Sequence, residues 1–228
     1  MHKPLVAVAF ALLLSTAAFA ADPRPYHLEL EANPTAPFPY LGKFGTVELH
    51  VFRSGVRAEA LWLDGFSRNG AGDVTVMNPL GRMYVDVPVR DISSIVMKLA
   101  GTPGPERNAK PVLGGTMKGT VSGIAATRHR LVYGPDAYID YWTTTTLPPN
   151  PQFRLLADQL LRGVSPGTAD VAKNIAGTPL YVELNFRRFK KLPLLKVKQL
   201  TFDASEEEDA LTRGALYVRA SVLEALWK

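Results

Sequence analysis

The sequence predicts an α+β chain of mainly β structure: a curved antiparallel sheet, or half-barrel, with a few helices packed on the concave face. Two observations predict this class. Segments that alternate apolar and polar residues recur between residues 46 and 202, with turn residues between them, and the segments with helical spacing are few and short. A twisted sheet of about eight or nine such strands curls on itself, so helices on its inner face would fill it wholly or in part.

The first twenty residues have the pattern of a secretory signal peptide. Lys3 gives a positive start, the residues from Leu5 to Leu14 are apolar, and Ala18 and Ala20 are the small residues that a signal peptidase needs. A buried or membrane-spanning helix is the alternative, but a span needs about 20 apolar residues and this run is shorter. We expect cleavage near Ala20, a periplasmic location, and a single domain over residues 21–228.

Composition narrows the classes of function. The chain of 228 residues contains no cysteine, which excludes thiol catalysis, thiolate metal sites and disulfides. Its formal net charge of +5 is modest. Nucleic-acid binding usually needs a dense basic stripe, so we expect no nucleic-acid partner.

One strand candidate, residues 26–30, precedes a proline-rich segment that we expect to form an extended loop up to residue 41. From Gly45 onward, alternation predicts a meander of short antiparallel strands. Its members cover 46–53, 57–63, 74–77 and 82–87, with turns at 54–55, 64–65 and 69–73.

A short amphipathic helix is predicted next, because four apolar residues recur at helical spacing: Ile92, Ile95, Val96 and Leu99. Asp91 occupies its expected N-cap position, and Gly101 lies just past its end. The prolines and glycines of residues 102–115 predict a loop.

The second half of the chain again combines strands and helices. Strands are expected over 116–122, 126–132, 137–144, 180–186 and 194–202. The pair Asn150–Pro151 is typical of a helix start, the pair Ser165–Pro166 repeats this signal, and Gly163 and Gly177 end the two helices. Residues 216–227 fit either a strand end or a short helix.

Four features of the sequence carry a resemblance to one known group of proteins. They are the leader with its following meander, the segment 78–84 that ends in an aromatic residue, the strand pair 119–126 and 139–144, and the hairpin start at 177–180. In these features the chain resembles the LolA/LolB-like group of exported bacterial proteins, in particular an uncharacterised branch of that group.

The resemblance covers most of the chain after the leader. It implies a half-barrel of antiparallel strands, closed by helices around an apolar cavity. Known members of the group bind the acyl chains of lipoproteins or other lipids, or act as sensors of envelope stress. No ligand-binding residue of the group can be matched to a position in this chain, so none is transferred to it.

No catalytic constellation emerges from the sequence. The chain after the leader has three histidines, His27, His50 and His129, and no two of them stand four residues apart as a helical metal pair requires. There is no G-x-S-x-G nucleophile motif, and the oxygen-rich residues 64–73 lack the spacing of a calcium loop. We therefore predict no catalytic residue, no metal ligand and no cofactor.

Five aromatic residues are candidates for lining a cavity: Trp62, Tyr84, Trp142, Phe153 and Phe186. Ligand pockets are lined mainly by such side chains. The alternative is that these residues fill an ordinary core. A sequence alone does not distinguish a filled interior from a hollow one, so both interpretations stay open.

Six cations stand among apolar residues near one predicted hairpin: Arg187, Arg188, Lys190, Lys191, Lys196 and Lys198. They fit a solvated edge strand, because lysine on an edge blocks pairing between sheets. They also fit docking to anionic lipid head groups, to which each cation near the surface contributes about 1 kcal/mol.

The leading hypothesis is a non-enzymatic periplasmic protein that binds a lipid or an acylated protein in an apolar cavity and makes peripheral contact with an anionic membrane. A structural or interaction subunit of a cell-envelope complex is the second hypothesis. An envelope hydrolase is the third, and it is disfavoured because no acid/base pair emerges.

Overall fold

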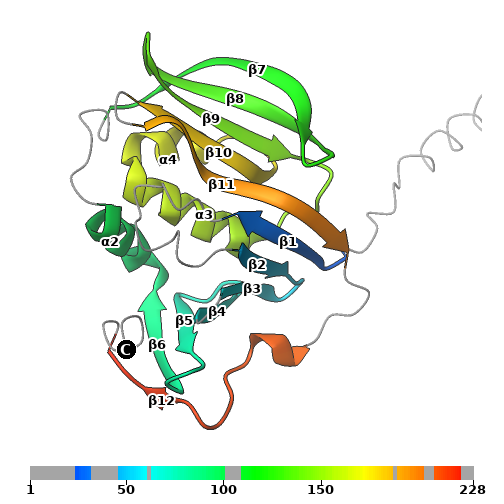
Figure 1. Cartoon of the computed structure of the whole chain (residues 1–228), viewed down its shortest axis with the longest axis vertical. Helices are drawn as coiled ribbons and strands as arrows, with labels where there is room; N and C mark the ends of the chain where they lie inside the picture. The colour runs from blue at the N-terminus through cyan, green and yellow to red at the C-terminus, as the bar shows by residue number, and fades with distance from the viewer. Residues whose placement is uncertain are drawn as a thin grey trace, which may run out of the picture.

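The computed structural model describes residues 24–31, 46–60, 63–100, 109–186, 189–202 and 208–221. Its strands form one large, curved sheet that does not close on itself, accompanied by a few helices (Figure 1). The prediction of a mainly β fold of the α+β class is therefore confirmed. The expected signal peptide lies outside the described residues.

The strands of the first half of the chain have six residues each, and most of those in the second half are longer; most strands pair with their neighbours in the sequence. The first half contains β1 (Tyr26–Glu31), β2 (Thr46–Val51), β3 (Gly55–Ala60), β4 (Leu63–Arg68), β5 (Asp73–Asn78) and β6 (Met83–Pro88). The second half contains β7 (Val112–Val121), β8 (Ile124–Gly134), β9 (Ala137–Thr144), β10 (Thr178–Phe186), β11 (Phe189–Phe202) and the two-residue β12 (Val218–Arg219).

The spatial order of the strands is β12-β6-β5-β4-β3-β2-β1-β11-β10-β9-β8-β7. Each half is an antiparallel meander, and β12 adds a short parallel edge to β6. The long strand β11 joins the halves, because it pairs with β10 at Lys196, opposite Tyr181, and with β1 at Phe202, opposite Tyr26. Figure 1 shows β11 running past both groups of strands.

Three α-helices and one short 3-10 helix complete the described chain. They are α2 (Val89–Ala100), α3 (Pro151–Val164), α4 (Pro166–Ala172) and the 3-10 helix η3 (Glu208–Leu211). Helix α3 contacts both α2 and α4, and it also touches β3 and β10. Within the described ranges, no helix is long and apolar enough to cross a membrane.

The start of α3 is the predicted one, and its cap is also a tether. The Asn150 side chain accepts a hydrogen bond from the Phe153 backbone N–H at 2.8 Å and donates one to the Phe52 carbonyl at 2.8 Å. Pro151 follows at the first helical position, where no backbone donor is needed. One buried amide therefore caps α3 and ties it to the turn between β2 and β3.

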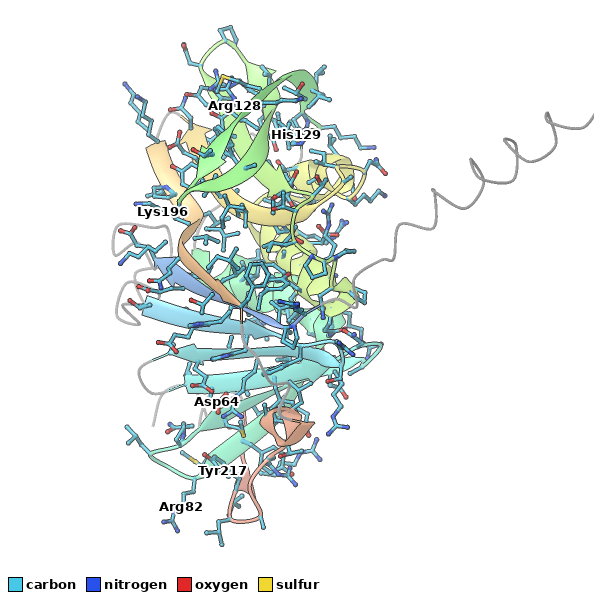
Figure 2. The ribbon with its side chains drawn as sticks, turned by 90° about the vertical axis from the view of Figure 1, so that its right-hand side faces the viewer. Asp64, Arg82, Arg128, His129, Lys196 and Tyr217 are labelled. Carbon is cyan, nitrogen blue, oxygen red and sulfur yellow. The ribbon has the colours of Figure 1, made fainter. Side chains whose placement is uncertain are left out.

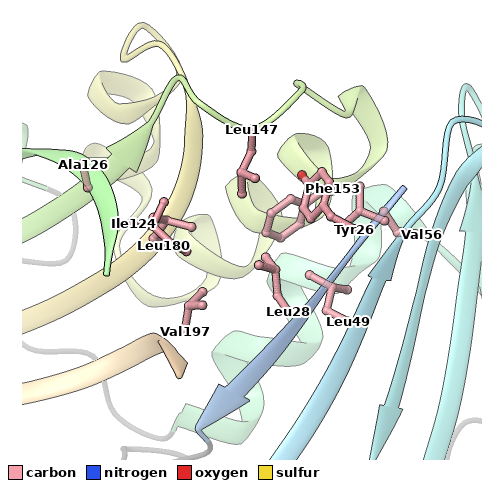
Figure 3. Packing of buried hydrophobic residues seen from close by; sticks show 11 residues of the cluster. Tyr26, Leu28, Leu49, Val56, Ile124, Ala126, Leu147, Phe153, Leu180 and Val197 are labelled. Carbon is pink, nitrogen blue, oxygen red and sulfur yellow. The ribbon is translucent and has the colours of Figure 1, made fainter. Parts of the chain in front are cut away.

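Two hydrophobic clusters form most of the core. The first contains Leu28 and Val197, both fully buried, and extends to Phe153 of α3. Figure 3 shows Ile124, Leu180 and Val197 of the second half facing Tyr26 and Leu28 of the first. The second cluster packs α3 and α4 against β8–β10, around Leu131, Ile139 and Leu184.

Two expectations for loops are wrong. Asp64 and Gly65 do not form a turn but lie inside β4, opposite Glu59 and Ala58. The inward positions of β4 carry Gly65 and Ser67, so the apolar alternation that marks a strand is absent there. The predicted loop 102–115 ends earlier than expected, because β7 begins at Val112 as an exposed edge strand paired with β8 alone.

Two predicted caps also differ. Helix α2 begins at Val89, so Asp91 lies in its first turn rather than at its N-cap. Ser165 stands before α4 but makes no capping bond with its side chain. Its hydroxyl instead meets the hydroxyls of Tyr133 and Thr168, because all three side chains are brought together between β8 and α4.

We predict that Asn150→Ala lowers the free energy of unfolding by about 2–3 kcal/mol, because it removes the cap and leaves a buried carbonyl without its donor. Asn150→Ser restores a capping oxygen but does not reach Phe52, so its stability should lie between those of the wild type and Asn150→Ala. Urea denaturation measures the three free energies of unfolding, which we expect to fall from wild type to Asn150→Ser to Asn150→Ala. Exposed Asn174→Ala is the control and changes stability by less than about 0.5 kcal/mol. Equal stability of the control and Asn150→Ala would contradict the tether.

Candidate functional site

An apolar groove of about 280 Å³ lies between strands β2–β5 and helix α3. Its size is close to the lower end of small-molecule sites, which span about 300–1,000 Å³. The lining residues are Val47 and Leu49 of β2, Val56, Ala58 and Ala60 of β3, Leu63 to Ser67 of β4, Val74 and Val76 of β5, and Leu156 of α3. The chemistry of this lining favours hydrocarbon over polar ligands.

The groove follows from small residues at opposed positions. Ala58 of β3 stands directly opposite Gly65 of β4, and Gly65 stands opposite Val76 of β5. No long side chain therefore rises from the centre of this part of the sheet. Leu156 of α3 reaches the groove from the helix side and also packs against the first core cluster.

Among the described residues of the groove lining, Asp64 is the one acidic residue, and Arg57 contacts its carboxylate. Arg57 forms an ion pair and a hydrogen bond with it. Burial raises the pKa of the Asp64 carboxyl above its ordinary value, and the Arg57 guanidinium acts in the opposite direction. Asp64 stands opposite Glu59, and Glu59 lies two residues from Arg57 on β3. All three side chains therefore lie on the same face of the sheet, opposite to the face of Val56.

The predicted aromatic residues do not gather at the groove. Phe153 is buried in the first cluster, Trp142 packs against the same cluster, and Phe186 meets the Tyr133 ring edge-on at 5.6 Å. Tyr84 lies in β6 opposite Met77, on the face of the sheet away from Val76, and the Arg213 guanidinium covers its ring at 3.7 Å. Trp62 lies outside the described residues.

The predicted basic residues divide into two pairs, and Arg187 and Arg188 lie outside the described residues. Lys196 forms an ion pair with Glu31 at 2.7 Å, and Lys198 lies 4.0 Å from Glu29. These contacts join β11 to β1, and Figure 2 shows Lys196 on β11 at one side of the molecule. Lys190 and Lys191 are exposed at the start of β11.

The interior near β8 and β9 holds polar groups that the sequence did not single out. Burial raises the pKa of the Tyr141 hydroxyl to about 12, and burial also raises the pKa of Asp158. Asp158 pairs with Arg154 at 3.4 Å on α3. His129 meets Thr143 at 3.3 Å, and within the described ranges no ion pair links it to a carboxylate.

The sequence alone did not identify two sets of candidate functional residues. One is the groove lining, because alternation identifies strands but not the volume left between them. The other is a group of metal-ligating side chains, His27, Glu48 and His50, on β1 and β2. The sequence shows that these residues lie in strand-like segments. It does not show the register of β1 and β2, which brings the three side chains together.

Comparison with known proteins supplies no family. No protein-family model matches the chain, and no curated protein matches it. Among solved structures, an uncharacterised conserved protein from Thermus thermophilus is similar over 93% of this chain and 99% of that chain, with 12% sequence identity and a TM-score of 0.46. A likeness of this degree carries no conclusion about function.

We predict that wild type loses stability relative to Asp64→Asn as the pH rises. Because the pKa of Asp64 is higher in the folded state, its contribution is fully present below the unfolded pKa of about 3.9 and disappears as the pH passes the folded pKa. Urea unfolding of wild type and Asp64→Asn, from acidic to neutral pH, measures the difference in their free energies of unfolding at each pH. Asp73→Asn, at an exposed position, controls for the loss of one carboxylate. A difference that grows in favour of wild type with rising pH would contradict the assignment.

Proposed function

We propose that this chain is an exported, non-enzymatic protein that binds a lipid, or the acyl chain of a lipoprotein, in the groove between β2–β5 and α3. The observation that carries the proposal is the groove itself, about 280 Å³ with an apolar lining. Its walls offer small and branched aliphatic side chains, which suit an extended hydrocarbon chain. The periplasmic location and the signal peptide belong to the same proposal.

The proposal includes a half-barrel like that of the LolA/LolB-like group, with the helices on the concave face. Two contacts support this placement. Phe153 of α3 packs in the cluster that contains the inward side chains of β1 and β2, and Leu161 packs in the cluster beneath β8–β10. Helix α3 would then lie along the inside of the sheet, and Leu156 would face the bound chain.

The expected affinity follows from the apolar area that binding removes from water. Each buried methylene contributes about 0.8 kcal/mol, so a chain that buries about eight of them gains about 6 kcal/mol. This free energy corresponds to a Kd of about 4 × 10⁻⁵ M. A transient carrier needs such an affinity, because it must release its ligand.

We predict that a fluorescent fatty acid, dansyl-undecanoic acid, binds the protein with a blue-shifted emission, and that Ala60→Phe weakens this binding by about tenfold or more. The phenylalanine ring would occupy the space that the small residues of β3 and β4 leave open. Fluorescence titration measures the Kd. Ala125→Phe is the matched control, because Ala125 is exposed on β8, outside the groove lining.

Circular dichroism checks that both variants keep the wild-type fold. Equal binding by wild type and Ala60→Phe would place the probe elsewhere. Absence of probe binding by wild type, together with no lipid in native mass spectra, would overturn the proposal and return the chain to the structural-subunit hypothesis.

Peripheral membrane contact through the start of β11 is the second part of the proposal. Lys190 and Lys191 are exposed there, where anionic head groups could reach them. Lys196 stands five residues further along the strand, which is about 17 Å at strand spacing. This distance exceeds the Debye length of about 8 Å at physiological salt, so Lys196 would be screened from the same surface.

We predict that replacing Lys190 and Lys191 with Gln weakens binding to phosphatidylglycerol vesicles by about 2 kcal/mol, roughly 30-fold. The double change Lys196→Gln and Lys198→Gln removes the same charge and is the matched control, with a much smaller effect. Vesicle co-sedimentation at low and at high salt measures both. Equal losses in the two double variants would show a response to net charge rather than contact through this end of β11.

A further inference from the structure

We propose that His27, Glu48 and His50 form a binding site for a divalent transition-metal ion, with Zn²⁺ as the ion that suits the ligands best. Two imidazoles and one carboxylate are ligands that Zn²⁺ takes in proteins, with the fourth position left to water. The site is separate from the groove, because its side chains stand on the other face of the strands. The inference does not depend on the proposed lipid ligand.

The register of β1 and β2 builds the site. His27 stands directly opposite His50, and Leu28, the next residue of β1, stands opposite Leu49. Leu28 and Leu49 are buried in the first core cluster, so the alternation of strand side chains turns the two histidines to the outer face. Glu48 shares that face with His50, two residues along β2.

The distances are close to those of a coordination sphere. One ligand atom from each of the three residues lies within 4.8 Å of the others, and His27 Nε2 stands 3.7 Å from a Glu48 carboxylate oxygen. Zn²⁺ binds such atoms at about 2.0–2.2 Å, so neighbouring ligand atoms of a tetrahedral site stand about 3.4 Å apart. Small rotations of the two half-buried imidazoles and of the exposed Glu48 side chain are enough to close this difference.

The arrangement of these side chains leaves one polar group poorly satisfied. His27 Nε2 is buried, and within the described part of the chain it has no hydrogen-bond partner, because 3.7 Å is too long for a hydrogen bond to Glu48. The centroids of the His27 and His50 rings lie 4.5 Å apart, and the rings stack with an interplanar angle of 11°, so the two imidazoles are adjacent. A metal ion would supply the partner that this nitrogen lacks.

The surrounding charges favour a cation at Glu48. Glu29 of β1 stands opposite Glu48 on one side, and Glu59 of β3 stands opposite it on the other. Like charges at directly opposed positions destabilise a sheet. Lys198 lies near Glu29, and Arg57 pairs with Glu59 at 2.7 Å, whereas within the described residues Glu48 has an ion pair with His27 alone.

Arg57 is the cation that would oppose a metal ion, because it stands across from His50 on β3. Its guanidinium is directed to other groups: it pairs with Asp64 and donates a hydrogen bond to the Ala210 carbonyl at 2.8 Å. Its charge is therefore offset by the carboxylates of Glu59 and Asp64. The region around Glu48 keeps an excess of carboxylates.

The test is Zn²⁺ titration by calorimetry of the complete, untagged chain, previously treated with a chelator. We expect one Zn²⁺ per chain, and we expect His27→Gln, Glu48→Gln and His50→Gln each to weaken binding by at least about tenfold. His129→Gln is the matched control and keeps wild-type binding, because His129 stands on β8 beside Thr143. Thermal unfolding with and without Zn²⁺ is the second readout, since a ligand of the folded state raises Tm.

The structural alternative is a stacked histidine pair that binds no metal. It predicts no Zn²⁺ heat and no Tm shift for wild type, and that result would overturn the proposal. Wild-type binding that survives in all three ligand variants would overturn it as well. The Tm values of the metal-free variants show that they fold, so loss of binding is not a loss of structure.

Discussion

The pairing of β1 with β11 is the constraint on which the rest of the structure depends. Each half of the sheet is a meander that its own local hairpins hold together. Among the described strands, the halves are joined by the pairing of these two strands, which come from distant parts of the chain. Backbone hydrogen bonds, the buried contact of Leu28 with the cluster that contains Val197, and the ion pair of Lys196 with Glu31 all serve this seam. Without it, β2–β6 would lose their position relative to β7–β10, and the single curved sheet would become two.

Helix α3 packs against both halves of the sheet and forms one wall of the groove. Its start is bound to the β2–β3 turn by Asn150, and Gln152 donates a hydrogen bond to the Ser67 hydroxyl of β4 at 2.6 Å. Its later turns pack in the cluster under β8–β10 through Leu161. The helix therefore touches both halves, and the volume that it leaves above Ala58 and Gly65 is the groove. Because the same few contacts position the helix and shape the groove, a change to them alters both the stability of the fold and the shape of the groove.

The two faces of the first half of the sheet serve different chemistry. Alternation along β1–β4 directs Leu28, Leu49 and Val56 to the core, and it directs histidines, glutamates and arginine to the other face. Ion pairs between neighbouring strands offset most of those charges, which explains how so many ionised groups stand close together. The exception is Glu48, flanked by carboxylates and facing a histidine nitrogen without a hydrogen bond. The excess of carboxylates around Glu48, on a surface where the other charges are paired, is the reason for proposing a cation there.

Local patterns in the sequence were sufficient for the class of the fold and for many of its elements. Alternation placed β9 at its observed bounds, and Asn150–Pro151 located the start of α3, because both signals depend on residues close together in the chain. Tertiary structure alone decided the pairing of β1 with β11, the opposition of Ala58 and Gly65, and the meeting of His27 with His50. Each of these depends on register between strands, which no local period records. Composition and periodicity thus determined what kind of sheet this chain forms, and the packing of distant segments decided where that sheet is hollow and where its charges meet.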